Sequence, residues 1–192
     1  MFRDWVLNED QHAQTVAHGA PFHAKITVPM FPLPEWQTFL AVQAGAAATL
    51  TGLVFVAVSI NLGRIMAVPG LPGRAAESIV QFLQVFFIST VALVPRQPPH
   101  MLACEILIIG LAAWAIQVIG QIRYRRSRPH PPWSWLIPRA IMSQFATVPF
   151  CGAGILLLLE NHSGVYWLVP GSVFSFVAGV MSAWVLLVEI LR

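Results

Sequence analysis

The chain has 192 residues, of which 57% are hydrophobic and only 10% are charged, and its mean hydropathy is +0.70. A soluble domain carries about 25% charged residues, so this composition excludes an ordinary soluble protein and makes lipid the expected solvent. The formal net charge of +3 does not indicate nucleic-acid binding, because five arginines lie in one segment between apolar runs, from Arg123 to Arg139. That clustering is typical of a cytoplasmic membrane loop.

Residues 1–35 are predicted to form a polar, net acidic tail outside the membrane, and residues 36–192 a transmembrane domain. The first residues, MFRDWVLNEDQHAQ, lack the basic and apolar regions of a signal peptide. Prolines near the end of the tail, in ITVPMFPLP, predict an extended chain rather than a helix.

The first predicted span covers residues 36–62. It contains no charged residue and is long enough to cross a hydrocarbon core of about 30 Å. Its small residues include two pairs four positions apart, Ala41 with Gly45 and Ala48 with Gly52. This spacing lets another helix backbone approach closely. We therefore expect this span to be the central packing helix of the protein.

Four further apolar runs predict spans at about residues 75–94, 101–122, 138–159 and 165–190. Pro138 is expected in the first turn of the fourth span, and Pro149 is expected to kink it. The predicted fold class is all-α, an integral membrane bundle of five transmembrane helices.

The basic residues predict the orientation of the bundle. With the N-terminus outside and the C-terminus inside, eight arginines fall on the inner side and three basic residues on the outer side. The opposite orientation reverses this ratio, against the positive-inside rule. The expected location is a bacterial-type inner (plasma) membrane.

The segment AGAAATLTGLVFVAVSINLGRI, followed by PGLPGRAAES, resembles an uncharacterised family of small bacterial multi-pass membrane proteins. Members of this family are sometimes labelled "modulator of FtsH protease". The resemblance covers residues 36–97. It implies a multi-pass membrane protein, and it implies no established active site.

Glutamines inside the predicted spans are the best pointers to function, because a polar group in hydrocarbon must find a partner. Gln81, Gln117 and Gln144 are predicted to lie at a similar depth, and Gln84 lies one turn further in. One hypothesis is a water-filled cavity or pore lined by these amides. The other is a set of interhelical hydrogen bonds that holds the bundle together.

The carboxylates and histidines offer weaker signals. Glu105 and Glu77 are each expected in the first turn of a helix, where the macrodipole favours a carboxylate. The six histidines include no HExxH motif and no paired Cys/His set, so neither a metal site nor a cofactor is predicted. No nucleophile elbow, phosphate-binding loop or carboxylate dyad is present, and an enzyme is not expected.

Two other groups of residues are candidates for contacts. Arg123, Arg125, Arg126 and Arg128 are expected to enforce topology and to bind anionic lipid, since clustered arginine beside a span attracts acidic headgroups. On the fifth span, Ser175 and Gly179 belong to a stripe of small residues that predicts a packing face.

These signals predict a non-enzymatic accessory or scaffold protein that acts through helix–helix contacts. Its expected partners are membrane lipids and either further copies of the chain or the other subunits of a larger membrane complex. The alternative is a small homo-oligomeric channel or transporter that uses the glutamine layer. An accessory protein needs a partner, whereas a channel needs only copies of itself.

Overall fold

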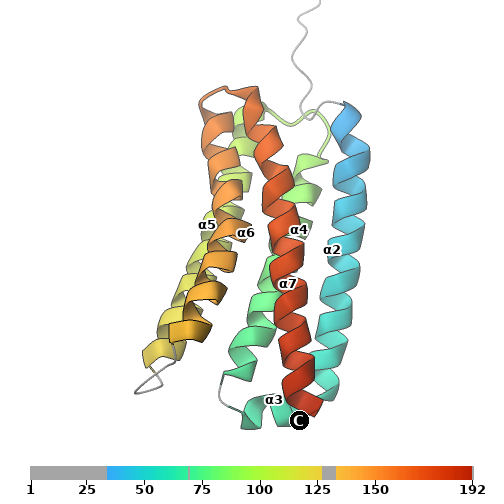
Figure 1. Ribbon diagram of the computed structural model, residues 1–192. Coiled ribbons are helices and arrows are strands. Elements are labelled where there is room, and N and C mark those ends of the chain that lie inside the picture. The colour runs from blue at the N-terminus through green and yellow to red at the C-terminus, as the bar shows by residue number, and fades with distance from the viewer. Residues whose placement is uncertain (1–33, 69, 127–132, 192) are drawn as a thin grey trace, which may run out of the picture. The chain divides into compact units, whose positions relative to one another are not determined.

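The computed structural model describes residues 34–68, 70–126 and 133–191, and every element in them is helical (Figure 1). These elements belong to one compact unit, Phe31–Arg192. The predicted tail therefore lies outside the described residues, apart from the start of the first helix. The elements are α2 (Pro34–Ile60), α3 (Leu62–Ala67), α4 (Leu71–Ala92), α5 (Pro99–Arg126), α6 (Trp133–Leu158), the 3-10 helix η1 (His162–Trp167) and α7 (Leu168–Leu191).

Five of these helices are long and apolar enough to cross a membrane: α2, α4, α5, α6 and the segment formed by η1 and α7. The predicted fold class, an all-α bundle of five transmembrane helices, is confirmed. An odd number of spans puts the start of α2 and the end of α7 at opposite ends of the bundle (Figure 1). Which end faces the cytoplasm stays a prediction.

The second span begins earlier than predicted, at Leu71. Gly70 ends the preceding turn with a φ of 102°, a backbone conformation that favours glycine, and Pro72 follows within the first helical turn. A Cβ at residue 70 would lie 2.7 Å from the Tyr124 ring, so glycine also allows α5 to approach. The segment before this turn, predicted as a loop, contains the short helix α3.

The third and fourth spans are also longer than predicted. Helix α5 continues to Arg126, so three arginines of the predicted loop lie in its last turn, where their charge complements the helix dipole. Helix α6 begins at Trp133, and Pro138 therefore lies inside the helix rather than in its first turn.

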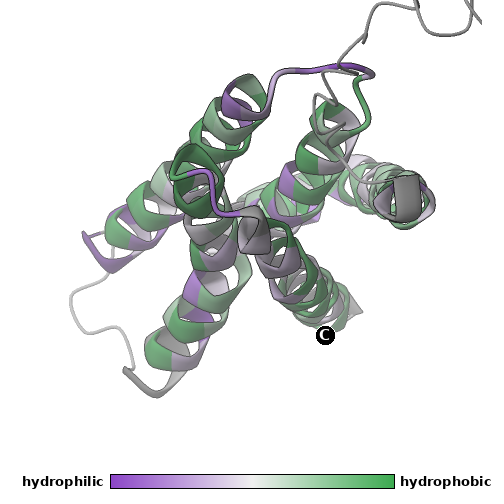
Figure 2. Cartoon of the chain, turned by 90° about the horizontal axis from the view of Figure 1, so that it is seen from above, coloured by the Kyte–Doolittle hydropathy of each residue, from purple (hydrophilic) through white to green (hydrophobic). Residues whose placement is uncertain are grey.

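The central helix of the bundle is α4. The prediction that the first span is the central packing helix is therefore wrong for the single chain. Of the most apolar part of each span, 56% of the residues are buried in α4 and only 22% in α2. Viewed along the bundle, α2 lies at its edge (Figure 2). Lipid is as apolar as a leucine side chain and gives an apolar helix no reason to be buried, whereas the glutamines of α4 require protein partners.

The half of the bundle where α4 ends and α5 begins is filled by apolar side chains, including the fully buried Phe150, Ile88 and Ile106. Helices α5 and α6 approach closely in this half, at Gly154. A Cβ at that residue would lie 3.0 Å from the backbone of Leu107. Most of the buried polar side chains lie in the other half, but this half also contains a buried polar contact, in which Ser89 Oγ donates to Gln43 Oε1 at 3.3 Å.

Candidate functional site

Two polar stripes face each other across the interior of the bundle. Helix α4 carries Glu77, Gln81 and Gln84 at a spacing of four and three residues, which places them on one face. Helix α6 carries Arg139, Ser143 and Thr147, each four residues apart. Gln117 of α5 and Ser175 of α7 complete this set. We call the eight residues the polar seam.

Gln117 is the centre of the seam. Its Oε1 accepts hydrogen bonds from Gln81 Nε2 at 2.7 Å and from Ser143 Oγ at 2.6 Å. Its own Nε2 donates to Thr147 Oγ1 at 3.0 Å. Three helices are thus joined through one amide, and its side chain is buried.

Gln84 extends the seam to a fourth helix, α7. Its Nε2 donates to Gln81 Oε1 at 2.8 Å and to Ser175 Oγ at 2.7 Å, and Ser175 Oγ donates to the Ala146 carbonyl at 3.0 Å. The Oε1 of Gln84 is buried without a hydrogen-bond partner. Most of the hydrogen-bonding groups of these amides are therefore paired inside a single bundle.

The structure brings together three of the four predicted glutamines and leaves out Gln144. Its Oε1 accepts a hydrogen bond of 2.9 Å from Trp114 Nε1 on the outer side of α5 and α6. Depth along a helix is set by residue number, but the facing direction is set by packing. On α6, Ser143 and Thr147 supply the side chains that meet Gln117.

An ion pair closes the seam at the arginine-rich end. Arg139 Nε donates to Glu77 Oε2, and the two side chains are 14% and 7% exposed. The Arg139 guanidinium also lies 5.8 Å from the centre of the Tyr124 ring, within cation–π range. The prediction that Glu77 lies in the first turn of its helix is wrong, because α4 starts at Leu71, and the Glu77 side chain is buried.

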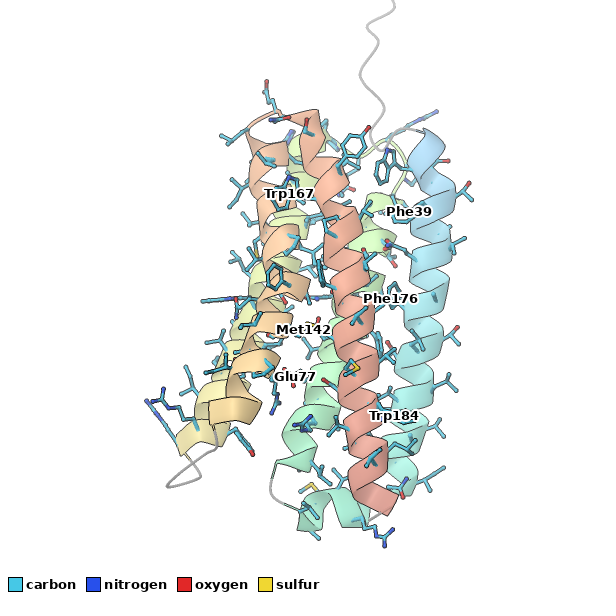
Figure 3. All side chains as sticks on the ribbon, viewed as in Figure 1. Phe39, Glu77, Met142, Trp167, Phe176 and Trp184 are labelled. Atoms are coloured by element: carbon cyan, nitrogen blue, oxygen red, sulfur yellow. The ribbon has the colours of Figure 1, made fainter. Side chains whose placement is uncertain are left out.

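Two cavities lie on either side of this ion pair. One, of about 410 Å³, is lined by α4, α6 and α7, including Glu77 and Gln81. The other, of about 320 Å³, is lined by α4 and α5 together with Arg139, and includes Gln117 and Arg123. Figure 3 labels Glu77 and Met142 in the half of the bundle where these cavities lie. Neither cavity is lined by a residue of the apolar core that fills the other half.

The remaining predicted residues fall into two groups. Ala41, Gly45, Ala48 and Gly52 are all exposed on α2, and a Cβ added at Gly45 or Gly52 would meet nothing within 4 Å. Ser175 and Gly179 instead face the interior. A Cβ at Gly179 would lie 2.6 Å from the Phe82 ring.

At the arginine-rich end, Arg123, Arg125 and Arg126 are exposed, and Arg128 lies outside the described residues. At the opposite end, Glu105 is half-buried and accepts a hydrogen bond from Gln97 Nε2. Within residues 34–68, 70–126 and 133–191, no three His, Cys, Asp or Glu side chains are grouped so that they could hold a metal ion.

Sequence reasoning assigned Arg139 only to topology and missed its pairing with Glu77. Ser143 and Thr147 were also not among the predicted residues. The signal was the i, i+4, i+8 spacing of polar residues on α6, opposite a matching stripe on α4. Two polar stripes of this kind in apolar spans indicate helices that face each other.

Five membrane-length apolar helices around a buried polar seam define a multi-pass integral membrane protein. The sequence matches no family model, no curated protein and no solved structure. The resemblance of residues 36–97 to the family labelled "modulator of FtsH protease" therefore stays a prediction.

The different positions of Gln117 and Gln144 lead to a prediction. Replacing Gln117 with leucine removes three hydrogen bonds, each worth about 0.6 kcal/mol in a bilayer, so the free energy of unfolding should fall by about 2 kcal/mol. The matched change Gln144→Leu removes one exposed bond and should cost about 0.6 kcal/mol or less. Reversible unfolding in mixed detergent micelles, followed by circular dichroism, measures both. Equal losses would contradict the central place of Gln117.

Proposed function

We propose that the protein is a non-enzymatic accessory or scaffold protein that acts through helix–helix contacts in the membrane, with α2 as its docking helix. The exposed stripe of Ala41, Gly45, Ala48 and Gly52 carries this proposal. Turning by ~100° per residue, α2 places this stripe roughly opposite its buried face, which includes Leu40 and Ala47. The stripe therefore faces away from the rest of the chain.

The hydroxyl side chains of α2 bond within their own helix, whereas the buried Gln43 on its inner face accepts from Ser89 of α4. Thr49, Thr51 and Ser59 each donate to the carbonyl four residues earlier, at 2.7–2.8 Å. Such bonding satisfies a hydroxyl within its own helix in lipid. What remains on this face is a smooth surface of small residues, which favours the close approach of a second transmembrane helix.

The partner is proposed to be a second copy of this chain or a subunit of a larger complex in the bacterial inner membrane. The alternative, a channel lined by the glutamines, has less support. Gln81, Gln84 and Gln117 are buried inside one bundle and bond to one another, so they do not face a pore between copies. The two cavities beside them are also lined by no residue of the apolar core in the other half of the bundle.

The double replacement Gly45→Leu and Gly52→Leu tests the proposal. The two leucines meet open space in the single chain, so the thermal unfolding midpoint should stay close to that of the wild type. Their bulk holds a docked helix away, and association should weaken by about tenfold or more, equivalent to about 1.4 kcal/mol. Light scattering in mild detergent gives the oligomer mass, and quantitative mass spectrometry gives the co-purifying proteins.

A matched control is Ala46→Leu, which adds similar bulk at an exposed position of α2 about 100° away from Gly45. It should leave association unchanged. If the double variant keeps its partners and its oligomer mass, α2 is not the docking helix. Ion flux into liposomes containing wild-type protein alone would instead support the channel.

A further inference from the structure

We propose that the 410 Å³ groove between α4, α6 and α7 is a specific site for one membrane phospholipid with an anionic headgroup. Its volume lies within the range of about 300–1,000 Å³ that is usual for small-molecule sites. The groove is distinct from α2, and the inference goes beyond the proposed docking function.

The walls of the groove favour an acyl chain. Met142 of α6 and Ala178, Met181 and Val185 of α7 provide a mostly apolar lining. In Figure 1, α5 and α6 diverge from α7 toward the end of the bundle where α4 begins, and the residues that line the groove belong to this half of α4, α6 and α7. Empty space beside apolar walls loses dispersion contacts, and water gains few hydrogen bonds there. A lipid chain is the abundant molecule that fills such a space.

The charges around the groove favour an anionic headgroup. The charged residues that line the groove are Arg74, Arg139 and Glu77, a net positive charge of one. Arg139 contacts Glu77 through its Nε, and a guanidinium has five N–H donors in a fork that suits a phosphate. Arg74 lines the same groove at its outer end, in the first turn of α4.

The length of the groove also suits a phospholipid. Between Arg74 and Gln81 the groove follows α4 for about 10 Å, so a headgroup at Arg74 places the start of its acyl chain beside the apolar residues of α6 and α7. In the predicted orientation this end faces the cytoplasm, where the leaflet carries anionic lipid. The partially buried arginines distinguish this site from the exposed Arg125 and Arg126, which attract anionic lipid without a groove.

Native mass spectrometry of the full-length protein tests the site, using phosphatidylglycerol and phosphatidylcholine with identical acyl chains. The wild type should retain one phosphatidylglycerol per chain with a preference of about tenfold, as expected when one charge-assisted hydrogen bond is added. Inorganic phosphate should not compete at millimolar concentration, because the acyl chain provides much of the binding. Equal retention of both lipids, or displacement by phosphate, would overturn the proposal.

Two variants locate the lipid. Ser182→Trp places an indole in the groove and should abolish retention, whereas the matched change Val180→Trp, at an exposed position of α7 outside the lining, should not. Arg74→Gln should remove the preference for phosphatidylglycerol but leave the groove open, so it tests the headgroup contact even if the tryptophan variant fails to fold. Loss of retention in Arg125→Gln/Arg126→Gln, with Arg74→Gln unaffected, would assign binding to the exposed arginines instead.

Discussion

Replacing Arg139 with methionine is expected to lower the free energy of unfolding by about 3–5 kcal/mol, because it leaves the Glu77 carboxylate buried without its partner. Glu77 is only 7% exposed and lies beside the glutamines of the polar seam, where its carboxylate accepts from Arg139 Nε. Unfolding in mixed detergent micelles at constant pH, followed by circular dichroism, measures the loss.

The double variant Glu77→Met/Arg139→Met is the control that separates charge from packing. Removing both members of a buried pair in favour of apolar side chains of similar size is often neutral or stabilising. The double variant should therefore recover most of the stability that the single variant loses. If it is as unstable as Arg139→Met, the loss comes from packing around Arg139 and not from an unpaired carboxylate. A single variant as stable as the wild type would show that the pair is not buried in the folded protein.

Replacing Gly154 with valine is expected to destabilise the bundle by about 3 kcal/mol, at the upper end of the usual cost of overpacking. The new Cβ would lie 2.9 Å from the Leu107 side chain and 3.0 Å from the Leu107 backbone, so α5 and α6 must move apart. Gly52→Val makes the same chemical change on α2, where nothing lies within 4 Å, and should stay within about 0.5 kcal/mol of the wild type. The same unfolding experiment compares the two.

A second-site change sharpens this test. Truncating Leu107 to alanine removes most of its side chain but leaves its backbone beside residue 154, so it should not rescue Gly154→Val. Rescue would show that the conflict is with the side chain alone. At Gly179 the situation differs, because the closest atoms belong to the ring of Phe82, which can be truncated. The two glycines are thus separable by their response to a change in the neighbour.

The glycines show which helix contacts could not be predicted from the sequence. Gly45 and Gly52 were chosen because of their regular spacing with alanine, and they face away from the chain. A Cβ at Gly154 would lie 3.0 Å from the Leu107 backbone of α5, yet this glycine lies in a short run, CGAGI, without a repeated spacing. Spacing indicates that a helix face is smooth, but it does not indicate which neighbour uses that face.

The sequence by itself determined that the chain is a membrane protein with five helical spans. These properties depend on the length and apolarity of each segment, which are sums over residues that need no knowledge of neighbours. The depth of each glutamine followed from residue number and helical rise in the same way. The start of the second span, at Leu71, did not follow from apolarity. Gly70 and Pro72 set it through backbone geometry, which hydropathy does not measure.

Only the tertiary structure decided which side chains meet. It placed α4 at the centre, joined Gln117 to Gln81 and Ser143, and turned Gln144 outward. It also paired Glu77 with Arg139 across 62 residues of sequence. The physical reason is that rotation of a helix about its own axis changes neither its apolarity nor its depth. In lipid that rotation is set by the polar groups, which must find partners inside the protein, and those partners come from other helices.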